Sequence, residues 1–252
     1  MKAGILALAM MLAVAGSAGH AEAAQKTLKV GVRDDVVHLG YLNPDTGKYY
    51  GMEIDLAAEL ADRLGYGNIE YISVDPDNRK EMLLNGNVDC LIAAYSVEKS
   101  RLENFDFSPA YYTDYSSIMV EKSTLIHGLS DLVGKKTGVL DGANTAPKLS
   151  GKMIELGLIT AEDTKGSSLV KMDSYKDLSV ALEEGTVDAV CMDGCIARAY
   201  MEDDREILEE TIGQEEYAVA TQKGSDLSTP VAETVQQMLD DGTVDRLIEK
   251  WN

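Results

Sequence analysis

The pattern L-x-x-G-x-V-D recurs at residues 83–89 and 182–188, far apart in the chain. Each copy follows apolar residues at helical spacing and precedes a short apolar run. Glycine commonly ends a helix because it adopts the left-handed conformation without steric cost. The recurrence therefore predicts two similar α/β lobes, each containing a helix–glycine–strand unit. A third copy at 239–245 leads into a helix-like run, so it is not the same unit.

The order of elements favours mainly parallel sheets. Residues 28–32, 69–74 and 88–93 are apolar runs that predict strands, whereas 53–64 and 79–84 have apolar residues at helical spacing. Strands that alternate with helices predict a layered α/β fold, with helices flanking a mainly parallel sheet in each lobe.

The charge of the chain argues against some classes of partner. The 252 residues are 45% hydrophobic, enough for a sizeable core, and carry a formal net charge of -20. Such a surface repels the phosphates of nucleic acids, so we expect no nucleic-acid partner. Beyond the N-terminus no segment reaches the roughly 18 apolar residues of a membrane helix, so we expect no direct membrane insertion.

The N-terminus has the order of a cleaved secretory signal peptide. Lys2 supplies a positive charge, residues 4–15 are apolar, and residues 21–23 read A-E-A. We therefore predict that residues 1–23 are removed and that the mature chain is exported to the periplasm. The alternative is an N-terminal membrane anchor.

The cysteines do not suggest a disulfide framework. There are three, Cys90, Cys191 and Cys195, and the first two lie in apolar runs where they should pack as small hydrophobic residues. A bridge between Cys191 and Cys195 stays open as an alternative in an oxidising compartment. The histidines are scattered, and we expect neither a metal nor a cofactor.

Two lobes in one chain create a cleft between them. Ligands of α/β sheets bind beyond the carboxyl ends of the strands, so binding residues are sought after each predicted strand. The candidates are Arg33, Ala94, Ser96, Arg101, Asn144, Thr145 and Asp193.

These groups suit a zwitterion. The guanidinium of Arg101 can hold a carboxylate with two parallel hydrogen bonds, and Asp193 can hold an ammonium group. Asn144 and Thr145 precede Pro147, which is tolerated in a first helical turn, so free N–H groups there could face the same carboxylate. Each residue also has a plainer interpretation: Arg101 as a surface charge, Asn144 as a helix cap, and Asp193 as a turn residue.

The chain resembles the family 3 extracellular solute-binding proteins, the polar amino-acid receptors of ABC transporters, over residues 27–251. The matching segments are 28–32, 51–57, 86–89, Arg101 with 105–112, 134–139, 185–189, Asp193, and 241–243 leading to Lys250 and Trp251. Individually these matches are weak, but their order and spacing together are specific.

The resemblance implies a two-lobed, type II periplasmic-binding-protein fold with two crossover strands. The crossovers are expected near 115–121 and 216–222. Lobe one would comprise residues 25–115 and 220–252, and lobe two residues 116–219. A hinge between the lobes would close over the ligand.

The resemblance also implies a function for the candidate residues. In the family, the position of Arg101 binds the α-carboxylate of the ligand and that of Asp193 its α-ammonium. The remaining family contacts correspond to Ala94, Ser96, Asn144 and Thr145. The chain is thus expected to be a monomeric periplasmic receptor that delivers a free amino acid to the membrane permease of an ABC transporter.

The identity of the amino acid stays open. Where many family members have aromatic residues that pack over the ligand, this chain has Leu39 and Met52. Arg33 would suit an acidic side chain, as in glutamate or aspartate. It could instead be a solvent-facing arginine paired with Asp34 or Asp35, in which case glutamine is a plausible ligand.

Other function classes have less support in the sequence. There is no Gly-rich phosphate loop, no G-x-S-x-G and no H-E-x-x-H, so we expect no enzyme. The same fold hosts an arogenate or prephenate (cyclohexadienyl) dehydratase, which is the enzymatic alternative. A ligand-sensing subunit for a chemoreceptor would differ in its partner and not in its fold.

Overall fold

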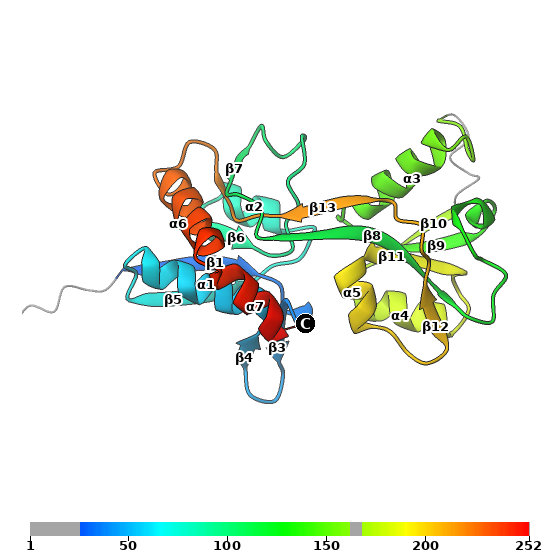
Figure 1. Ribbon diagram of the computed structural model, residues 1–252, viewed down its shortest axis with the longest axis horizontal. Helices are drawn as coiled ribbons and strands as arrows, with labels where there is room; N and C mark the ends of the chain where they lie inside the picture. The colour runs from blue at the N-terminus through cyan, green and yellow to red at the C-terminus, as the bar shows by residue number, and fades with distance from the viewer. Residues whose placement is uncertain (1–25, 162–167, 252) are drawn as a thin grey trace, which may run out of the picture.

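The apolar runs of the chain assemble into two separate large sheets. The computed structural model describes residues 26–161 and 168–251. In Figure 1 the two sheets, each with its helices, form two lobes connected by two long strands. The proposed signal peptide at residues 1–23 lies outside the described residues.

Lobe one is built on a five-stranded sheet with the strand order β5-β1-β6-β14-β7. β1 pairs in parallel with β5 and β6, whereas β14 is antiparallel to its neighbours. The strands are β1 (Thr27–Val32), β5 (Asn68–Ser73), β6 (Cys90–Ile92), β7 (Phe105–Phe107) and β14 (Ala220–Gln222). The helices are α1 (Met52–Arg63), α2 (Arg79–Leu84), α6 (Ser228–Asp240) and α7 (Thr243–Trp251).

Lobe two is built on a six-stranded sheet in which β10, β9 and β11 are parallel and β8, β12 and β13 add antiparallel pairs. Its strands are β8 (Tyr112–Glu121), β9 (Lys136–Leu140), β10 (Ser168–Met172), β11 (Ala189–Asp193), β12 (Arg205–Ile207) and β13 (Gly213–Tyr217). Its helices are α3 (Thr145–Glu155), α4 (Tyr175–Glu183), α5 (Gly194–Ala199) and the 3-10 turn Leu129–Leu132.

β8 and β13 cross between the lobes side by side (Figure 1). They pair antiparallel from Ser116 opposite Gly213 to Tyr112 opposite Tyr217. The first crossing overlaps the expected segment 115–121 at Tyr115 and Ser116, and the return crossing overlaps the expected segment 216–222 at Glu216 and Tyr217. It ends at Tyr217, and residues from Ala220 already belong to the lobe-one sheet. The precise lobe boundaries given above stay a prediction.

The repeated glycines do what the pattern predicts. Gly86 and Gly185 follow α2 and α4 with φ of 70° and 67°, the left-handed conformation that ends a helix. Gly242 has the same conformation but leads into α7, so the third copy joins two helices. The recurring helix–glycine–strand units are thus at the centre of the two lobes.

A small antiparallel sheet lies between the end of β1 and the start of α1. It consists of β2 (Asp35–Val36), β3 (Gly40–Asn43) and β4 (Lys48–Tyr50). It carries the chain from Arg33 to α1 and brings Leu39 and Met52 into buried positions. This hairpin therefore forms part of the lobe-one wall that faces lobe two.

Buried side chains fill both lobes, and the cysteines belong to this interior. Cys90 and Cys191 are fully buried, as expected for small hydrophobic residues. Cys195 is half-buried, and all three are free thiols, so the alternative of a Cys191–Cys195 bridge is not realised. Among the described residues, none of the helices has the length and apolar character needed to cross a bilayer.

Candidate functional site

Arg101 is held in place by the loop that follows β6. Its Nη1 donates to the carbonyl oxygen of Ser96 at 2.7 Å, and its guanidinium carbon lies 4.1 Å from the centroid of the Tyr95 ring. The guanidinium of Arg79 lies over the same ring at 4.6 Å. A guanidinium fixed by stacking and by a hydrogen bond is pre-organised for a planar anion.

Arg101 borders two hollows between the lobes. One, of about 230 Å³, is shared with Gly142, and the other, of about 300 Å³, is shared with Asn144 and Lys148. The lobes approach each other closely here. A Cβ built on Gly142 of lobe two would lie only 2.1 Å from Oδ1 of Asp77 in lobe one. Arg101 is therefore a residue of the interlobe region and not an isolated surface charge.

Ala94 adopts a conformation that costs energy for a residue with a side chain. Its φ is 46°, and its N–H donates to Oε1 of the buried Glu53 at 2.7 Å. Tyr111 donates to the same oxygen at 2.5 Å, and Arg79 donates to the carbonyl oxygen of Ala93 at 2.8 Å. Burial raises the pKa of Glu53. These buried contacts fix the strained segment that leads to Ser96.

Asp193 is the last residue of β11 and is only 5% exposed. The hydroxyl of Tyr217 donates to its Oδ2, and Oγ of Ser116 lies 3.2 Å from its Oδ1. Burial, followed by the negative charge of Glu215, raises the pKa of Asp193 to about 6. Its side chain makes no capping hydrogen bond to α5, which argues against a merely local role.

Glu215 is the central residue that the sequence analysis missed. It is fully buried in β13 and accepts hydrogen bonds from Ser116 Oγ at 2.7 Å, Lys148 Nζ at 2.8 Å and Asn144 Nδ2 at 3.0 Å. Burial disfavours its charged form, but the bonds from Lys148 and other donors outweigh this and lower its pKa. Binding residues of α/β folds are expected at the ends of strands, whereas Glu215 lies within a crossing strand. Alternation along β13, which buries Glu215 and Tyr217, is the signal that could have found it.

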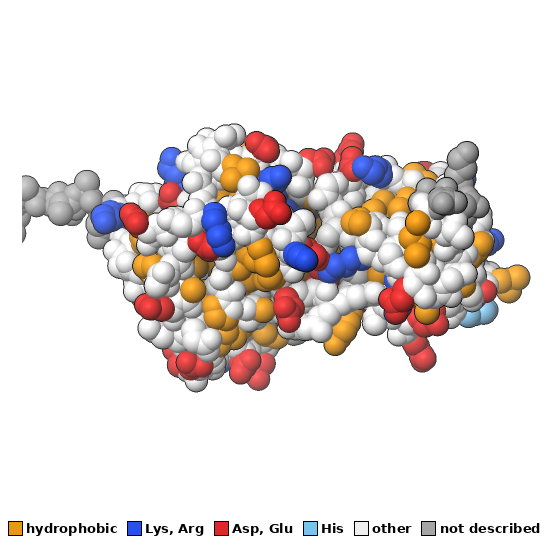
Figure 2. All heavy atoms as spheres, turned by 90° about the horizontal axis from the view of Figure 1, so that it is seen from above, with side chains coloured by type: hydrophobic (Ala, Val, Ile, Leu, Met, Phe, Trp, Pro, Cys, Tyr) orange, Lys and Arg blue, Asp and Glu red, His pale blue; other side chains and the backbone are white. Residues whose placement is uncertain are grey.

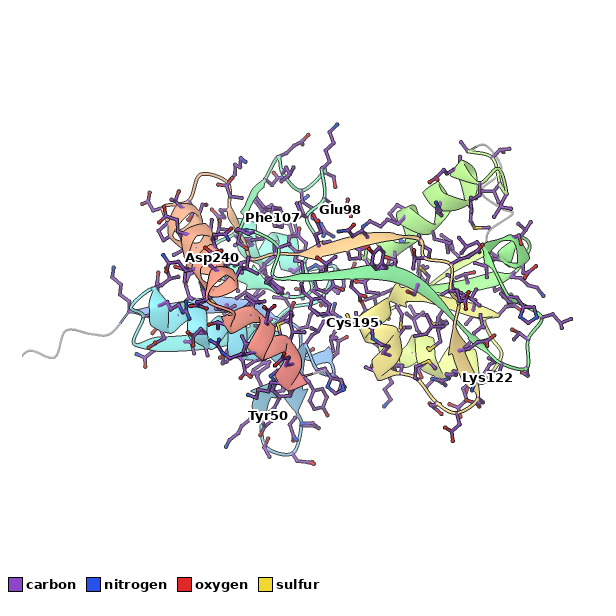
Figure 3. The ribbon with its side chains drawn as sticks, viewed as in Figure 1. Tyr50, Glu98, Phe107, Lys122, Cys195 and Asp240 are labelled. Carbon is purple, nitrogen blue, oxygen red and sulfur yellow. The ribbon has the colours of Figure 1, made fainter. Side chains whose placement is uncertain are left out.

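Asn144, the N-cap residue of α3, and Lys148, in its first turn, are four residues apart on one face. Asn144 also donates to Oε1 of Glu98 at 2.9 Å, and Lys148 forms an ion pair with Glu98 at 2.8 Å. Glu98 belongs to lobe one, so α3 is bonded to lobe one and to the crossing strand together. Figure 3 shows Glu98 between the lobes, and Figure 2 shows basic and acidic side chains side by side at the waist.

Thr145 and Ser96 are both buried beside this network. Thr145 is 2% exposed, and its Oγ1 has no hydrogen-bond partner within the described residues. Ser96 forms an isolated β-bridge with Tyr217 and supplies the carbonyl oxygen that holds Arg101. A buried hydroxyl without a hydrogen-bond partner is a group that a ligand could satisfy.

Arg33 is buried and already paired. It is 2% exposed, and it donates to both carboxylate oxygens of Asp35, from Nε at 2.9 Å and from Nη2 at 2.7 Å. Its guanidinium also lies 5.4 Å from the ring centroid of Tyr175 in lobe two. Burial works to lower the pKa of Arg33, but Tyr175 and Asp35 outweigh it and raise the pKa. The alternative of a solvent-facing arginine paired with Asp34 or Asp35 is thus confirmed in its pairing with Asp35 and wrong in its exposure to solvent.

Leu39 and Met52 do not border the hollows at Arg101. They lie in a separate interlobe cavity, together with Trp251. The other candidates are connected more closely: Arg101 bonds to Ser96, Ser96 pairs with Tyr217, and Tyr217 bonds to Asp193. Arg101 and Asp193 thus lie at the two ends of this series of contacts. Asp193 does not border either of the hollows at Arg101.

The chemistry of this site is that of charge recognition. It combines one fixed guanidinium with two buried carboxylates and several hydroxyl and amide groups. Among the residues that the structure describes, no group of three or more His, Cys, Asp or Glu side chains is placed to hold a metal ion. The arrangement offers a guanidinium to a carboxylate and carboxylates to an ammonium group.

Comparison with known proteins connects this site to a family. The family model for bacterial extracellular solute-binding proteins, family 3, matches residues 28–252. The chain is 26% identical over 227 residues to the ABC transporter glutamine-binding protein GlnH of Bacillus subtilis, a match that covers 88% of this chain and 79% of that protein.

Solved structures agree in fold. An ancestral arginine-binding protein bound to glutamine is 30% identical, with a TM-score of 0.79, and the match covers 90% of this chain and 98% of that one. The ancestral amino acid-binding protein AncCDT-1, a precursor of cyclohexadienyl dehydratase, is 25% identical, with a TM-score of 0.77 and coverages of 89% and 95%. With the match to the family model spanning nearly the whole chain, this protein belongs to the family 3 bacterial extracellular solute-binding proteins.

Proposed function

We propose that this protein binds one free amino acid between its lobes and delivers it to the permease of an ABC transporter. The α-carboxylate lies against Arg101, and the α-ammonium lies against Asp193. The observation that carries the proposal is the buried pair of carboxylates, Asp193 and Glu215, within one bonded chain of contacts from the fixed guanidinium of Arg101. Lys148 already pairs with Glu215, so an ammonium group would supply the positive charge that Asp193 lacks.

Residues around the two charges would complete the binding site. The backbone of Ala94 and the hydroxyl of Ser96 would contact the ligand from lobe one. Asn144 and Thr145 would contact its carboxylate from lobe two, where the buried Oγ1 of Thr145 has no partner among the described residues. Closure of the hinge would then exclude water from these bonds and strengthen them.

Glutamine suits the site better than glutamate or aspartate. An acidic side chain would need the guanidinium of Arg33, which is already bonded to both oxygens of Asp35. An amide side chain needs no net charge on its partner, so the Arg33–Asp35 pair can offer it both a donor and an acceptor. The similarity to a glutamine-binding protein and to a structure with bound glutamine supports the same choice.

Transport and not catalysis is the role we propose for this binding. The similar ancestral protein AncCDT-1 is described as an amino acid-binding protein that preceded a dehydratase, so the enzymatic alternative merits a direct test. Incubating the protein with glutamine, arogenate or prephenate should leave each compound unchanged. Formation of an aromatic product would favour the dehydratase alternative.

We place the protein in the periplasm, as a monomer whose partner is the membrane permease. The family consists of extracellular solute-binding proteins, which supports this location. A chemoreceptor remains an alternative partner for the same closed form. Transport of labelled amino acid into vesicles that contain the permease should require this protein.

A thermal-shift screen of the twenty amino acids tests the proposed function. Binding to the folded state alone raises the melting temperature, by an amount that grows with the ratio of ligand concentration to Kd. We expect glutamine to give the largest shift, and Arg101→Ala to abolish it. If none of the amino acids raises the melting temperature at millimolar concentration, the proposal is wrong.

A further inference from the structure

Gly142 brings the backbone of lobe two against the backbone of lobe one. It belongs to the turn between β9 and α3, and it lies against Pro76 and Asp77 in the loop before α2. A Cβ built on Gly142 would lie 2.9 Å from the backbone nitrogen of Asp77 and 2.9 Å from the carbonyl carbon of Pro76. Carbon atoms in favourable contact are about 3.5–4.0 Å apart, so no side chain fits between the lobes at this point.

The lobe-one side of this contact is held in place by its own loop. The ring of Pro76 fixes its φ. Oδ1 of Asp75 accepts the N–H of Asp77 at 2.9 Å and that of Asn78 at 2.8 Å. The side-chain amide of Asn78 donates back to Oδ2 of Asp75 at 2.6 Å. The peptide between Pro76 and Asp77 therefore cannot retreat from lobe two without breaking this turn.

The lobe-two side is tied to the neighbouring strand β10. The N–H of Asp141 donates to the carbonyl oxygen of Met172 at 2.9 Å. Oδ1 of Asp141 forms an ion pair with Nζ of Lys171 at 2.6 Å. Since the backbone is held on both sides of the contact, a side chain at position 142 would be accommodated by separation of the lobes.

Separation at Gly142 would also affect the interlobe bonds beside it. Asn144 donates to Oε1 of Glu98 at 2.9 Å, and Nζ of Lys148 lies 2.8 Å from the same oxygen. A hydrogen bond is lost once its heavy atoms are about 3.6 Å apart. A small opening of the lobes would therefore break the first of these contacts and weaken the second.

We propose that Gly142 permits full closure of the lobes, because only a residue without a side chain lets the two backbones meet. The inference rests on the proposed function in one respect, that the closed form is the one that holds the amino acid. Gly142 acts as a positioning residue, since it need not touch the ligand. A side chain there would lower the fraction of the protein that can close, and the affinity would fall by the same factor.

Two substitutions separate the contact between the lobes from strain within the backbone. Gly142 has a φ of 66°, at which alanine is strained, whereas asparagine tolerates this conformation and has a larger side chain. Strain alone would make Gly142→Ala the more harmful change, but a contact between lobes makes Gly142→Asn at least as harmful. Gly185→Ala and Gly185→Asn are the matched controls, because Gly185 has a φ of 67° and a Cβ built on it meets no atom within 4 Å.

Binding kinetics should be measured with glutamine, or with whichever amino acid gives the largest thermal shift. Both Gly142 variants should bind it about tenfold or more weakly. The loss should come from faster dissociation, because an open cleft still admits the ligand but does not retain it. The two Gly185 variants should bind as the unaltered protein does. An unchanged dissociation rate in Gly142→Asn, or a milder effect of asparagine than of alanine, would overturn the proposal.

The orientation of the lobes can be measured without any ligand. Residual dipolar couplings in NMR spectra report how the two lobes are oriented relative to each other. Gly142→Asn should turn the lobes away from the orientation found in the unaltered protein, whereas Gly185→Asn should not. If the unaltered protein binds no amino acid, the proposed function fails, and these couplings still decide the role of Gly142. The same orientation in Gly142→Asn and in the unaltered protein, with and without glutamine, would refute that role.

Discussion

Ser116 stands between two buried carboxylates, with its Oγ 3.2 Å from Asp193 and 2.7 Å from Glu215. A hydroxyl has one hydrogen to donate, so it cannot satisfy both oxygens together. Lys148 and Asn144 stabilise the charge of Glu215. The carboxylate of Asp193 is therefore the less well stabilised of the two, and a bound proton or an ammonium group would stabilise it.

Stability should change with pH through Asp193. Its pKa is raised to about 6 from an ordinary value of 3.8, first by burial and then by Glu215. The folded protein thus holds this proton more tightly than the unfolded chain, so stability should fall as pH rises from about 4 to about 6. Asp193→Asn should lack this fall and, without ligand, melt at a higher temperature at pH 7. If the melting temperatures of the two proteins change with pH in the same way across this range, Asp193 is not the group responsible.

Amino-acid binding should have the opposite dependence on pH. Below about pH 6 Asp193 carries a proton, which it must release before it can hold an ammonium group. The affinity should therefore fall below pH 6, by up to about tenfold per unit. Calorimetry at pH 5.5 in buffers of different ionisation enthalpy should detect the released proton. No proton release there would rule out this role for Asp193.

Glu53 should matter for stability because it holds the strained Ala94. Glu53→Met leaves the buried N–H of Ala94 and the hydroxyl of Tyr111 without their acceptor. Each unsatisfied group costs about 1–3 kcal/mol, so urea unfolding should show a loss of that order or more. Tyr111→Phe removes only one of the two bonds and should cost less. Equal losses of unfolding free energy in the two variants would argue against this role of Glu53.

At the scale of elements, α3 and β13 bring the two lobes together at one point. The N-terminal end of α3 carries Asn144 as its N-cap and Lys148 in its first turn, and both bond to Glu98 of lobe one and to Glu215 of β13. The four-residue spacing is visible in the sequence, but its partners are not. They depend on how a helix of one lobe meets a loop of the other.

Lys148 should contribute to closure and hence to affinity. Lys148→Gln removes the cation shared by Glu98 and Glu215, so amino-acid binding should weaken about tenfold. Lys152→Gln, one turn later, is the matched control, because Lys152 pairs only with Glu155 on its own helix among the contacts described. Isothermal titration of both variants measures the difference. An equal effect of the two substitutions would remove the closing role from Lys148.

The elements themselves were largely predictable, for local reasons. The spacing of apolar residues anticipated α1, α2, β1 and β5, and the glycines at 86 and 185 marked helix ends. The same reasoning selected Asp193, which is the last residue of β11, and Arg101, which lies in the loop after β6, and their contact with a ligand stays a prediction. Glu215 was missed because it lies mid-strand, and the burial of Arg33 was missed because Tyr175 comes from the other lobe. Such contacts depend on long-range packing that no local pattern encodes.

For the molecule as a whole, the two crossing strands could act as a hinge about which the two lobes move. The charges proposed to bind the ligand come from both sides of it, with Arg101 in lobe one and Asp193 at the end of β11 in lobe two. A ligand that bonds to both would favour the closed arrangement by its differential affinity for that state.

The measurement that tests this account most directly is calorimetric titration with the best amino acid from the screen and with its two analogues that lack the α-ammonium or the α-carboxylate. Each analogue should bind the unaltered protein about tenfold or more weakly. Asp193→Asn should no longer distinguish the analogue without ammonium, and Arg101→Ala should no longer distinguish the one without carboxylate. If both variants discriminate as the unaltered protein does, these two residues do not hold the ligand.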